Sequence, residues 1–352
     1  MMNRPLVGVL MGGPSSEHDV SLMTGTNILK TLEMSGRWRA VPITITKSGH
    51  WLYGEDRLWR NPGEAIANVD VICNALHGFF GEDGKVQQIL EHHAVPYNGS
   101  RIFASAVAFN KVLARKILRK KGLLMPRAVV ARRYGDESYE DLARRVLRIL
   151  PPPWVVKPVA SGSSVGVSLV KHVDDLPKAL EHACAHDDSM AGAQAESDSA
   201  KAASDTAQAL AEEYKKGREI TCGILEHFRG ERYMALPPIE ICPPSSASFF
   251  NYQVKYDGST NEICPAEFSD AMLKKIRETA IAAHTALGCR DYSRTDMILC
   301  GTDLYVLEVN TLPGLTKESL FPKAAAAAGL SFPDLLEHLM TRTIERKEKR
   351  QI

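Results

Sequence analysis

Short apolar runs alternate with amphipathic stretches over the first hundred residues. Residues 6–11 (LVGVLM), 40–46 (AVPITIT) and 69–76 (VDVICNAL) predict buried strands, because each is a short apolar run rich in β-branched residues. The chain from about Ser16 predicts a helix, with Asp19 three residues further on in a capping-box-like spacing, and residues 81–93 predict another. This order predicts a doubly wound parallel sheet.

The middle of the chain predicts a two-layer α+β unit. Its predicted helices cover residues 110–121, 139–150 and 174–185, and its predicted strands cover 127–133, 151–159 and 165–172. Residues 186–209 then hold eight Ala, four Ser and four Asp, with no Val, Ile, Leu or aromatic residue. Such a stretch cannot bury apolar surface, so we predict an exposed insertion there.

The last part of the chain predicts a second α+β unit. Strands are expected at residues 218–225, 235–241, 293–300 and 303–310, and helices at 273–288 and 332–350. Residues 248–265 carry many polar and turn-forming residues and predict a long, mobile loop. We therefore divide the chain into domains 1–99, 100–212 and 213–352, the middle one with the insertion at about 186–209.

Composition narrows the class of protein. The 43 Lys and Arg residues balance 42 Asp and Glu residues, which argues against nucleic acid or an anionic membrane as the main partner. No apolar run reaches the roughly 18 residues of a membrane span. The seven cysteines are scattered and form no CxxC pair, so we expect reduced thiols and a cytoplasmic protein.

The sharpest chemical pattern lies in the last two predicted strands. Asp296 interrupts one apolar strand, and Glu308 and Asn310 leave the other on the same face. Two antiparallel strands can place Asp296 opposite that pair, and three oxygen ligands suit Mg²⁺ or Mn²⁺. The alternative is a solvated sheet face with ordinary acidic residues.

Two glycine-containing loops are weaker patterns. The loop from Gly162 to Gly166 is preceded by Lys157, and its backbone N–H groups can approach phosphate, although a plain hairpin turn is the simpler interpretation. Gly12 and Gly13 lie between a strand and a helix, with Glu17 available to hold an ammonium or simply to stabilise the helix dipole. His77 follows a strand at the edge where α/β sheets bind ligands. In the basic helix, Lys111 alone suggests a phosphate contact, and the rest predicts a solvated face.

Taken together, these segments resemble the D-alanine–D-alanine ligase family of the ATP-grasp superfamily. The resemblance is carried by GGPSSEHDVSL, ALHGFFGEDGKVQQILE, VPYNGS, KPVASGSSVGVS, KGREITCGIL, LPPIEI, VKYDGSTNEICPAE, GCRDYSRTDM and LEVNTLPGLTKESLFP. It covers nearly the whole chain and implies an ATP-grasp fold, with ATP held between the central and C-terminal domains. It also implies an ATP-dependent enzyme of peptidoglycan precursor synthesis and suggests a homodimer.

The resemblance implies roles for residues around the two substrates. Glu17 would hold the ammonium of the first D-alanine in a set with Ser163 and Tyr256, with His77 beside that subsite. Arg294 and the backbone N–H of Gly314 would stabilise the oxyanion, and Ser319 and Leu320 would receive the second D-alanine.

It also implies contacts for ATP and two Mg²⁺ or Mn²⁺ ions. Asp296, Glu308 and Asn310 would hold the ions. The residues implied around ATP are Lys111, Lys157, Ser164, Glu212, Glu213, Tyr214, Lys215, Glu219 and Lys255. Of these, Glu212 would meet the adenine amino group and Glu219 the ribose hydroxyls, while Lys255 would reach the γ-phosphate and the substrate carboxylate.

Three positions depart from the family pattern. Asn110 stands where relatives commonly have Asp, and Asn251 and Gln253 replace acidic residues in the loop that carries Tyr256. The central insertion is also longer than expected. Two alternatives therefore stay open: a ligase of the same mechanism with another D-amino acid or a D-hydroxy acid as second substrate, and an ATP-binding regulatory module without catalysis.

Overall fold

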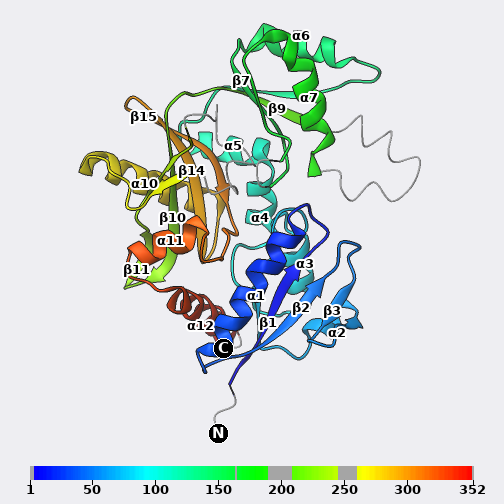
Figure 1. Ribbon diagram of the computed structural model, residues 1–352, viewed down its shortest axis with the longest axis vertical. Coiled ribbons are helices and arrows are strands. Elements are labelled where there is room, and N and C mark those ends of the chain that lie inside the picture. The colour runs from blue at the N-terminus through cyan, green and yellow to red at the C-terminus, as the bar shows by residue number, and fades with distance from the viewer. Residues whose placement is uncertain (1–3, 163–164, 189–207, 245–259, 351–352) are drawn as a thin grey trace.

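Three β-sheets organise the chain. The computed structural model describes residues 4–162, 165–188, 208–244 and 260–350 (Figure 1). The sheets have the strand orders β4-β3-β2-β1-β5, β6-β9-β7-β8 and β13-β12-β10-β14-β15, with β11 paired to β10 in the last of them.

The first sheet is the predicted doubly wound unit. β1 (Leu6–Gly12) pairs in parallel with both β2 (Arg39–Ile45) and β5 (Val71–Asn74). Because side chains alternate along a strand, Val7 and Val9 pack towards α1 (His18–Met34), whereas Leu10 packs with the residues of α3 (Lys85–His92). The predicted strands and helices of this unit are therefore confirmed.

The first sheet also contains short elements that the pattern did not predict. β3 (Trp51–Tyr53) and β4 (Leu58–Arg60) add an antiparallel hairpin to its edge, followed by α2 (Pro62–Ile66). Strands of three residues are too short to show periodicity.

The second sheet is antiparallel and is covered by helices on one face. Its strands are β6 (Ala128–Arg132), β7 (Trp154–Pro158), β8 (Ser168–Val170) and β9 (Gln208–Glu213). Trp154 and Val156 pack against α6 (Tyr139–Ile149) and α7 (Leu176–Ala185), and the short helix η1 (Val173–Asp175) precedes α7. Figure 1 shows this layer at the top of the molecule.

The third sheet connects the other two. Its strands are β10 (Arg218–Phe228), β11 (Glu231–Ala235), β12 (Ile239–Cys242), β13 (Asn261–Ile263), β14 (Tyr292–Cys300) and β15 (Asp303–Asn310). One face packs on α4 (Ile102–Phe109), α5 (Lys111–Lys120) and α10 (Asp270–Leu287). Leu335 and Leu339 of α12 (Phe332–Arg350), which follows α11 (Leu320–Ala327), join the core beneath β1.

Three predicted segments differ clearly from the structure. The strand expected at 235–241 begins only at Ile239, because two prolines without N–H groups precede it. Within the predicted loop 248–265, residues 261–263 form β13, and residues 248–259 lie outside the described residues. The insertion is shorter than predicted: Asp187 is buried and Ala209 lies in the core of β9, whereas residues 189–207 lie outside the described residues.

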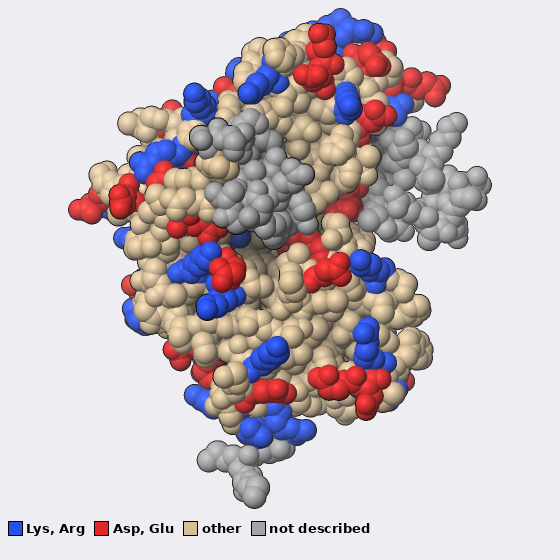
Figure 2. Space-filling view, viewed as in Figure 1, with Lys and Arg blue, Asp and Glu red and all other residues tan. Residues whose placement is uncertain are grey.

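Two chemical expectations can be compared with the structure. All seven cysteines fall within the described residues, and none of them forms a disulfide. Among the helices that the structure describes, none has the length and apolar character needed to cross a bilayer. On the face shown in Figure 2, basic and acidic side chains are interspersed, in keeping with the formal net charge of +1.

Candidate active site between the sheets

One face of the third sheet gathers polar side chains from three strands. In the antiparallel register of β14 and β15, Arg294 lies opposite Asn310 and Asp296 lies opposite Glu308. On the other side of β14, Asp296 lies opposite Thr221 of β10. The predicted cross-strand arrangement of Asp296, Glu308 and Asn310 is thus confirmed, while their role as metal ligands stays a prediction.

Arg294 and Asp296 form a two-bond ion pair on this face. Arg294 Nε and Nη2 donate to the two Asp296 carboxylate oxygens at 2.9 and 2.8 Å, and Thr221 Oγ1 donates to Asp296 Oδ1 at 2.6 Å. Burial opposes the charge of Arg294, but the Asp296 carboxylate outweighs it and raises the pKa of Arg294 above its ordinary value. The guanidinium is therefore a fixed positive charge at the site.

The oxygen donors on this face fit a hard divalent cation. Asn310 Oδ1 accepts a bond from Leu312 N at 2.9 Å, which orients the amide and leaves it a second lone pair. Asp296, Glu308 and Asn310 together provide two carboxylates and one amide. Within the described residues, no group of three or more His, Cys, Asp or Glu side chains is arranged to hold a metal. An ion bound here would complete its coordination with phosphate oxygens and water, as Mg²⁺ commonly does.

The second sheet contributes a buried cluster of opposite charges. Glu212 on β9 is paired with Lys157 of β7, Nζ to Oε2 at 2.5 Å, and with Arg115 of α5. The expectation of a solvated basic helix was therefore wrong for Arg115, which is buried. A sequence signal existed: Arg115 follows Lys111 by four residues, which places both on one helix face.

Lys111 connects this cluster to the third sheet. Its Nζ donates to the carbonyl of Ser161 at 2.9 Å and lies 3.9 Å from Glu308 Oε2. Burial lowers the pKa of Lys111, and the nearby Glu308 carboxylate opposes that shift. The ammonium thus lies between Ser161, the residue before Gly162, and the proposed metal ligand Glu308.

The chain between β9 and β10 crosses from one sheet to the other. Glu213 pairs with Lys215 at 2.9 Å, and Tyr214 N donates to the carbonyl of Pro153 at 3.0 Å. Lys215 Nζ also lies 4.6 Å from the centre of the Tyr305 ring. Further on, burial and the charge of Asp296 raise the pKa of Glu219 to about 7.

The first sheet brings Glu17 and His77 to the same region. Glu17 is the N-cap of α1 and is buried, and His77 Nε2 lies 3.1 Å from Thr24 Oγ1. The backbone of Gly162 approaches so closely that a Cβ there would lie 2.2 Å from Glu17 Oε2. The structure therefore brings the glycine loop and Glu17 together.

Gly314 and Ser319 complete this end of the site. A Cβ on Gly314 would lie 2.7 Å from Ser319 Oγ and 3.9 Å from His77 Cε1, so the three segments meet where only glycine fits. Ser319 Oγ is 2.7 Å from Thr316 Oγ1. The side chain of Leu320, by contrast, packs into the hydrophobic core.

Four predicted site residues cannot be placed. Ser163, Ser164, Lys255 and Tyr256 lie outside the described residues, as do Asn251 and Gln253. The third departure, Asn110, has a local explanation: it is the N-cap of α5, and its side chain accepts bonds from the N–H groups of Val112 and Leu113. Asn and Asp cap helices about equally well, so the exchange preserves the helix start.

Comparison with known proteins agrees with this architecture. The chain matches two family descriptions, the D-ala D-ala ligase N-terminus over residues 6–65 and 57–100 and the D-ala D-ala ligase C-terminus over residues 117–341. A D-alanine–D-alanine ligase of Syntrophobacter fumaroxidans is 38% identical over 340 residues, covering 96% of this chain and 97% of the relative. One of Desulforudis audaxviator is 37% identical, covering 97% and 99%.

Solved structures give the same result. A Bacillus anthracis D-alanine–D-alanine ligase complexed with ATP is 31% identical, with a TM-score of 0.74, covering 98% of this chain and 99% of that one. A D-Ala:D-Ser ligase from Enterococcus faecalis is 27% identical, with a TM-score of 0.78, covering 96% and 99%. Fold and site together define a protein of the ATP-grasp class. More particularly, the chain belongs to the D-alanine–D-alanine ligase family.

Proposed function

We propose that this protein joins two D-alanine molecules to D-alanyl-D-alanine, with ATP converted to ADP and phosphate. The observation that carries the proposal is the approach of Lys111 Nζ to Glu308 Oε2 at 3.9 Å. This contact sets a lysine at the start of α5, of the kind that binds phosphate, against the acidic face of β14 and β15. A triphosphate bound between them would meet positive charge on one side and metal-binding oxygens on the other.

The first step is activation of a carboxylate. The carboxylate of the first D-alanine, with its ammonium held by Glu17 beside His77, attacks the γ-phosphorus of ATP and releases ADP. Lys111 and Lys157 offset the repulsion between the two anionic reactants, with Lys255 as a third cation in this proposal. Glu212, Glu213, Tyr214, Lys215 and Glu219 hold the nucleoside. The product is an acyl phosphate, which has the leaving group that a free carboxylate lacks.

The second step forms the peptide bond. The neutral amine of the second D-alanine, seated near Ser319 and Leu320, attacks the acyl carbon. The oxyanion that forms is stabilised by Arg294 and the Gly314 N–H, and the tetrahedral intermediate collapses with loss of phosphate and an amine proton. Losing one such donor typically costs roughly 3–4 kcal/mol. The loop that carries Tyr256 would close over the intermediate and exclude water, and the loop that carries Ser163 and Ser164 would close over the ATP phosphates.

We propose that two Mg²⁺ or Mn²⁺ ions are held by Asp296, Glu308 and Asn310. When bound, such ions neutralise phosphate charge during transfer. Glu308→Gln keeps the shape of the side chain but removes one negative charge, so we expect turnover to fall by at least about 10²-fold. Phosphate release at saturating metal measures this effect. Near-normal activity would contradict the metal assignment, and Glu318→Gln, on an exposed side chain, is the matched control.

The decisive experiment is a product assay. Incubation with ATP, Mg²⁺ and D-alanine should release phosphate and yield the dipeptide, as identified by mass spectrometry. ATP binding without D-alanine-dependent ADP formation would instead support the regulatory alternative. Because a D-Ala:D-Ser ligase shares the fold at a TM-score of 0.78, D-serine and D-lactate belong in the same assay as competing second substrates.

The remaining proposals concern organisation and context. We propose domains 1–99, 100–212 and 213–352, each built around one of the three sheets. The reaction would supply peptidoglycan precursor synthesis in the cytoplasm, where ATP is available, and the protein would act as a homodimer. Sedimentation of the purified chain tests the oligomeric state.

A further inference from the structure

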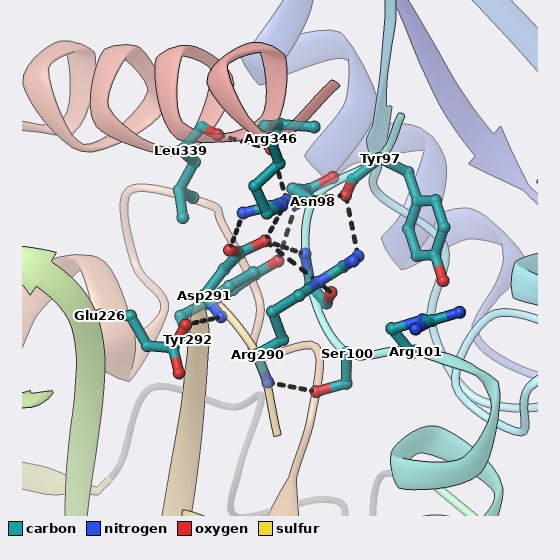
Figure 3. Close-up of polar contacts among 12 residues, drawn as sticks. Tyr97, Asn98, Ser100, Arg101, Glu226, Arg290, Asp291, Tyr292, Leu339 and Arg346 are labelled. Carbon is teal, nitrogen blue, oxygen red and sulfur yellow. Dashed lines mark hydrogen bonds and ion pairs between the residues drawn. The ribbon is translucent and has the colours of Figure 1, made fainter. Parts of the chain in front are cut away.

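A buried polar junction ties the first sheet to the third. The segment between α3 and α4 meets the start of β14 and the end of α12 there (Figure 3). We call this group the clasp; it consists of Asn74, Tyr97, Asn98, Gly99, Arg290, Asp291, Tyr292 and Arg346. None of these residues touches the proposed substrates or ATP in the mechanism above.

Asn98 is the centre of a continuous hydrogen-bond chain through the clasp. Its Nδ2 donates to Tyr292 Oη at 3.2 Å, and its Oδ1 accepts from Asn74 N at 2.7 Å. Asn74 Oδ1 in turn accepts from Leu76 N at 3.1 Å. Asn74, Asn98 and Tyr292 are at most 1% exposed, so water cannot replace a lost partner.

Asp291 fixes the same junction by charge. Its carboxylate accepts from Gly99 N at 2.8 Å and pairs with Arg346, whose Nη2 donates at 3.0 Å. Its own N–H donates to Glu226 at 3.0 Å. Asp291 has a φ of 65°, an unfavourable backbone conformation for a residue with a side chain, held here by partners on every side.

The chain leaves the clasp directly towards three parts of the proposed active site. His77 follows Asn74 by three residues, and Arg294 follows Tyr292 by two. A Cβ on Gly99 would lie 3.4 Å from Leu312, which precedes Gly314 by two residues. A shift of the clasp would therefore displace His77, Arg294 and Gly314 relative to one another.

We propose that Asn98 is a positioning residue for the ligation, acting through Asn74 and Tyr292 to hold the first D-alanine subsite at a fixed distance from the oxyanion donors. This inference rests on the proposed function. The nucleotide residues Lys157, Glu212 and Glu213 lie on the second sheet, away from the clasp. Loosening the clasp should therefore impair the use of D-alanine and leave ATP binding unchanged.

The test compares three single variants and one double variant. Asn98→Ala breaks the chain at both ends, and Tyr292→Phe removes a single hydroxyl and so preserves packing. The matched control is Trp38→Phe, which removes a bond from Trp38 Nε1 to Glu337 Oε2 of 2.6 Å. That bond also ties the first sheet to α12. However, Trp38 lies just before β2, at the amino end of the parallel strands, whereas Asn74 lies at their carboxyl end. Each variant is assayed well below its melting temperature.

We expect Asn98→Ala to lower kcat/KM for D-alanine by about tenfold or more, since small misplacements of reacting groups carry costs of this size. Tyr292→Phe should give a smaller loss in the same direction, and combining it with Asn98→Ala should add little because both break one chain. KM for ATP should stay within about twofold of the wild-type value. Trp38→Phe should lower the melting temperature without changing kcat/KM.

Two outcomes would overturn the inference: wild-type kcat/KM in folded Asn98→Ala and Tyr292→Phe, or an equal loss in Trp38→Phe. D-alanine binding is also measured by calorimetry in the presence of a non-hydrolysable ATP analogue. This measurement distinguishes failure of the positioning role from failure of the proposed function. A wild-type protein that binds both but forms no dipeptide refutes the ligase activity. In that case, weaker D-alanine binding by Asn98→Ala still supports the positioning role, and unchanged binding refutes it.

Discussion

At the scale of single residues, the charge state of the site is set by a few buried partners. Arg294 stays charged because Asp296 faces it with two hydrogen bonds. The electrostatic environment of Glu219 has the opposite effect. Burial and the same Asp296 carboxylate both disfavour its charge and raise its pKa to about 7. The protein without ligand thus carries an electrostatic cost when Glu219 is ionised.

Glu219→Gln should therefore stabilise the unliganded protein in a pH-dependent way. A pKa raised on folding means that the ionised form costs stability; the cost is absent below the unfolded pKa, grows as the pH rises, and is complete above about 7. At about 1.4 kcal/mol per pKa unit, the rise of the pKa from 4.5 to about 7 corresponds to roughly 3.5 kcal/mol. Melting temperatures at pH 5 and pH 8 measure it, and the variant should gain stability mainly at pH 8.

Glu213→Gln serves as the matched control of opposite sign. Burial opposes the Glu213 charge, but Lys215 and Arg127 outweigh it and lower the pKa. Its substitution should therefore lower the melting temperature at pH 8. Equal responses of both variants would contradict the assigned causes of the two shifts.

At the scale of elements, α5 shows how one helix serves both core and site. Ala114 and Leu118 pack under the third sheet, while Lys111 and Arg115 face the second sheet. The helix starts at a defined place because Asn110 caps it and pairs as a bridge with Ala160. The start of the helix thereby fixes Lys111 at the entrance of the glycine loop.

Asn110→Ala should cost about 1 kcal/mol of stability, the usual value of a lost N-cap. Because Lys111 is the first residue of the helix, KM for ATP should rise as well. Asn110→Asp is the control: it retains the cap and adds a charge that favours the helix N-terminus, so both quantities should stay near wild type. An unchanged KM for ATP in Asn110→Ala would contradict the predicted link between the helix cap and nucleotide binding.

At the scale of the whole molecule, the two ends of the insertion are joined by one side chain. Asp187 Oδ1 accepts from Ala160 N at 2.9 Å, and Oδ2 accepts from Gln208 N at 3.0 Å. The same carboxylate thus holds the end of α7, the start of β9 and the beginning of the glycine loop. The described residues on either side of the insertion are thereby held together at this point.

Deleting residues 189–206 should therefore leave the fold intact, as the composition alone also predicts. We expect a melting temperature within a few degrees of wild type, because shortening a loop changes its closure entropy only slowly. Circular dichroism and thermal melts measure this. Asp187→Ala in the full chain should be the more damaging change, and insoluble protein after the deletion would contradict the prediction.

The order of most elements, and the face that the polar side chains of β14 and β15 share, could be predicted from the amino-acid sequence. Apolar periodicity identified the long helices and strands, since burial requires it wherever an element has one inner face. Alternation in a strand also fixed Glu308 and Asn310 on one face before any partner strand was known. Short elements such as β3 and β13 were not predicted, because a strand of three residues is too short to show a periodic pattern of apolar positions.

Which distant residues became partners follows from the packing of the folded chain and could not be predicted from the sequence. Nothing in the chain's local pattern pairs Arg115 with Glu212, Asp187 with Ala160, or Asn98 with Tyr292. Each of these polar groups is buried, and a buried polar group must find a partner wherever the packed chain supplies one. Local spacing decides which face a side chain takes, whereas the meeting of faces depends on how three separate sheets pack together.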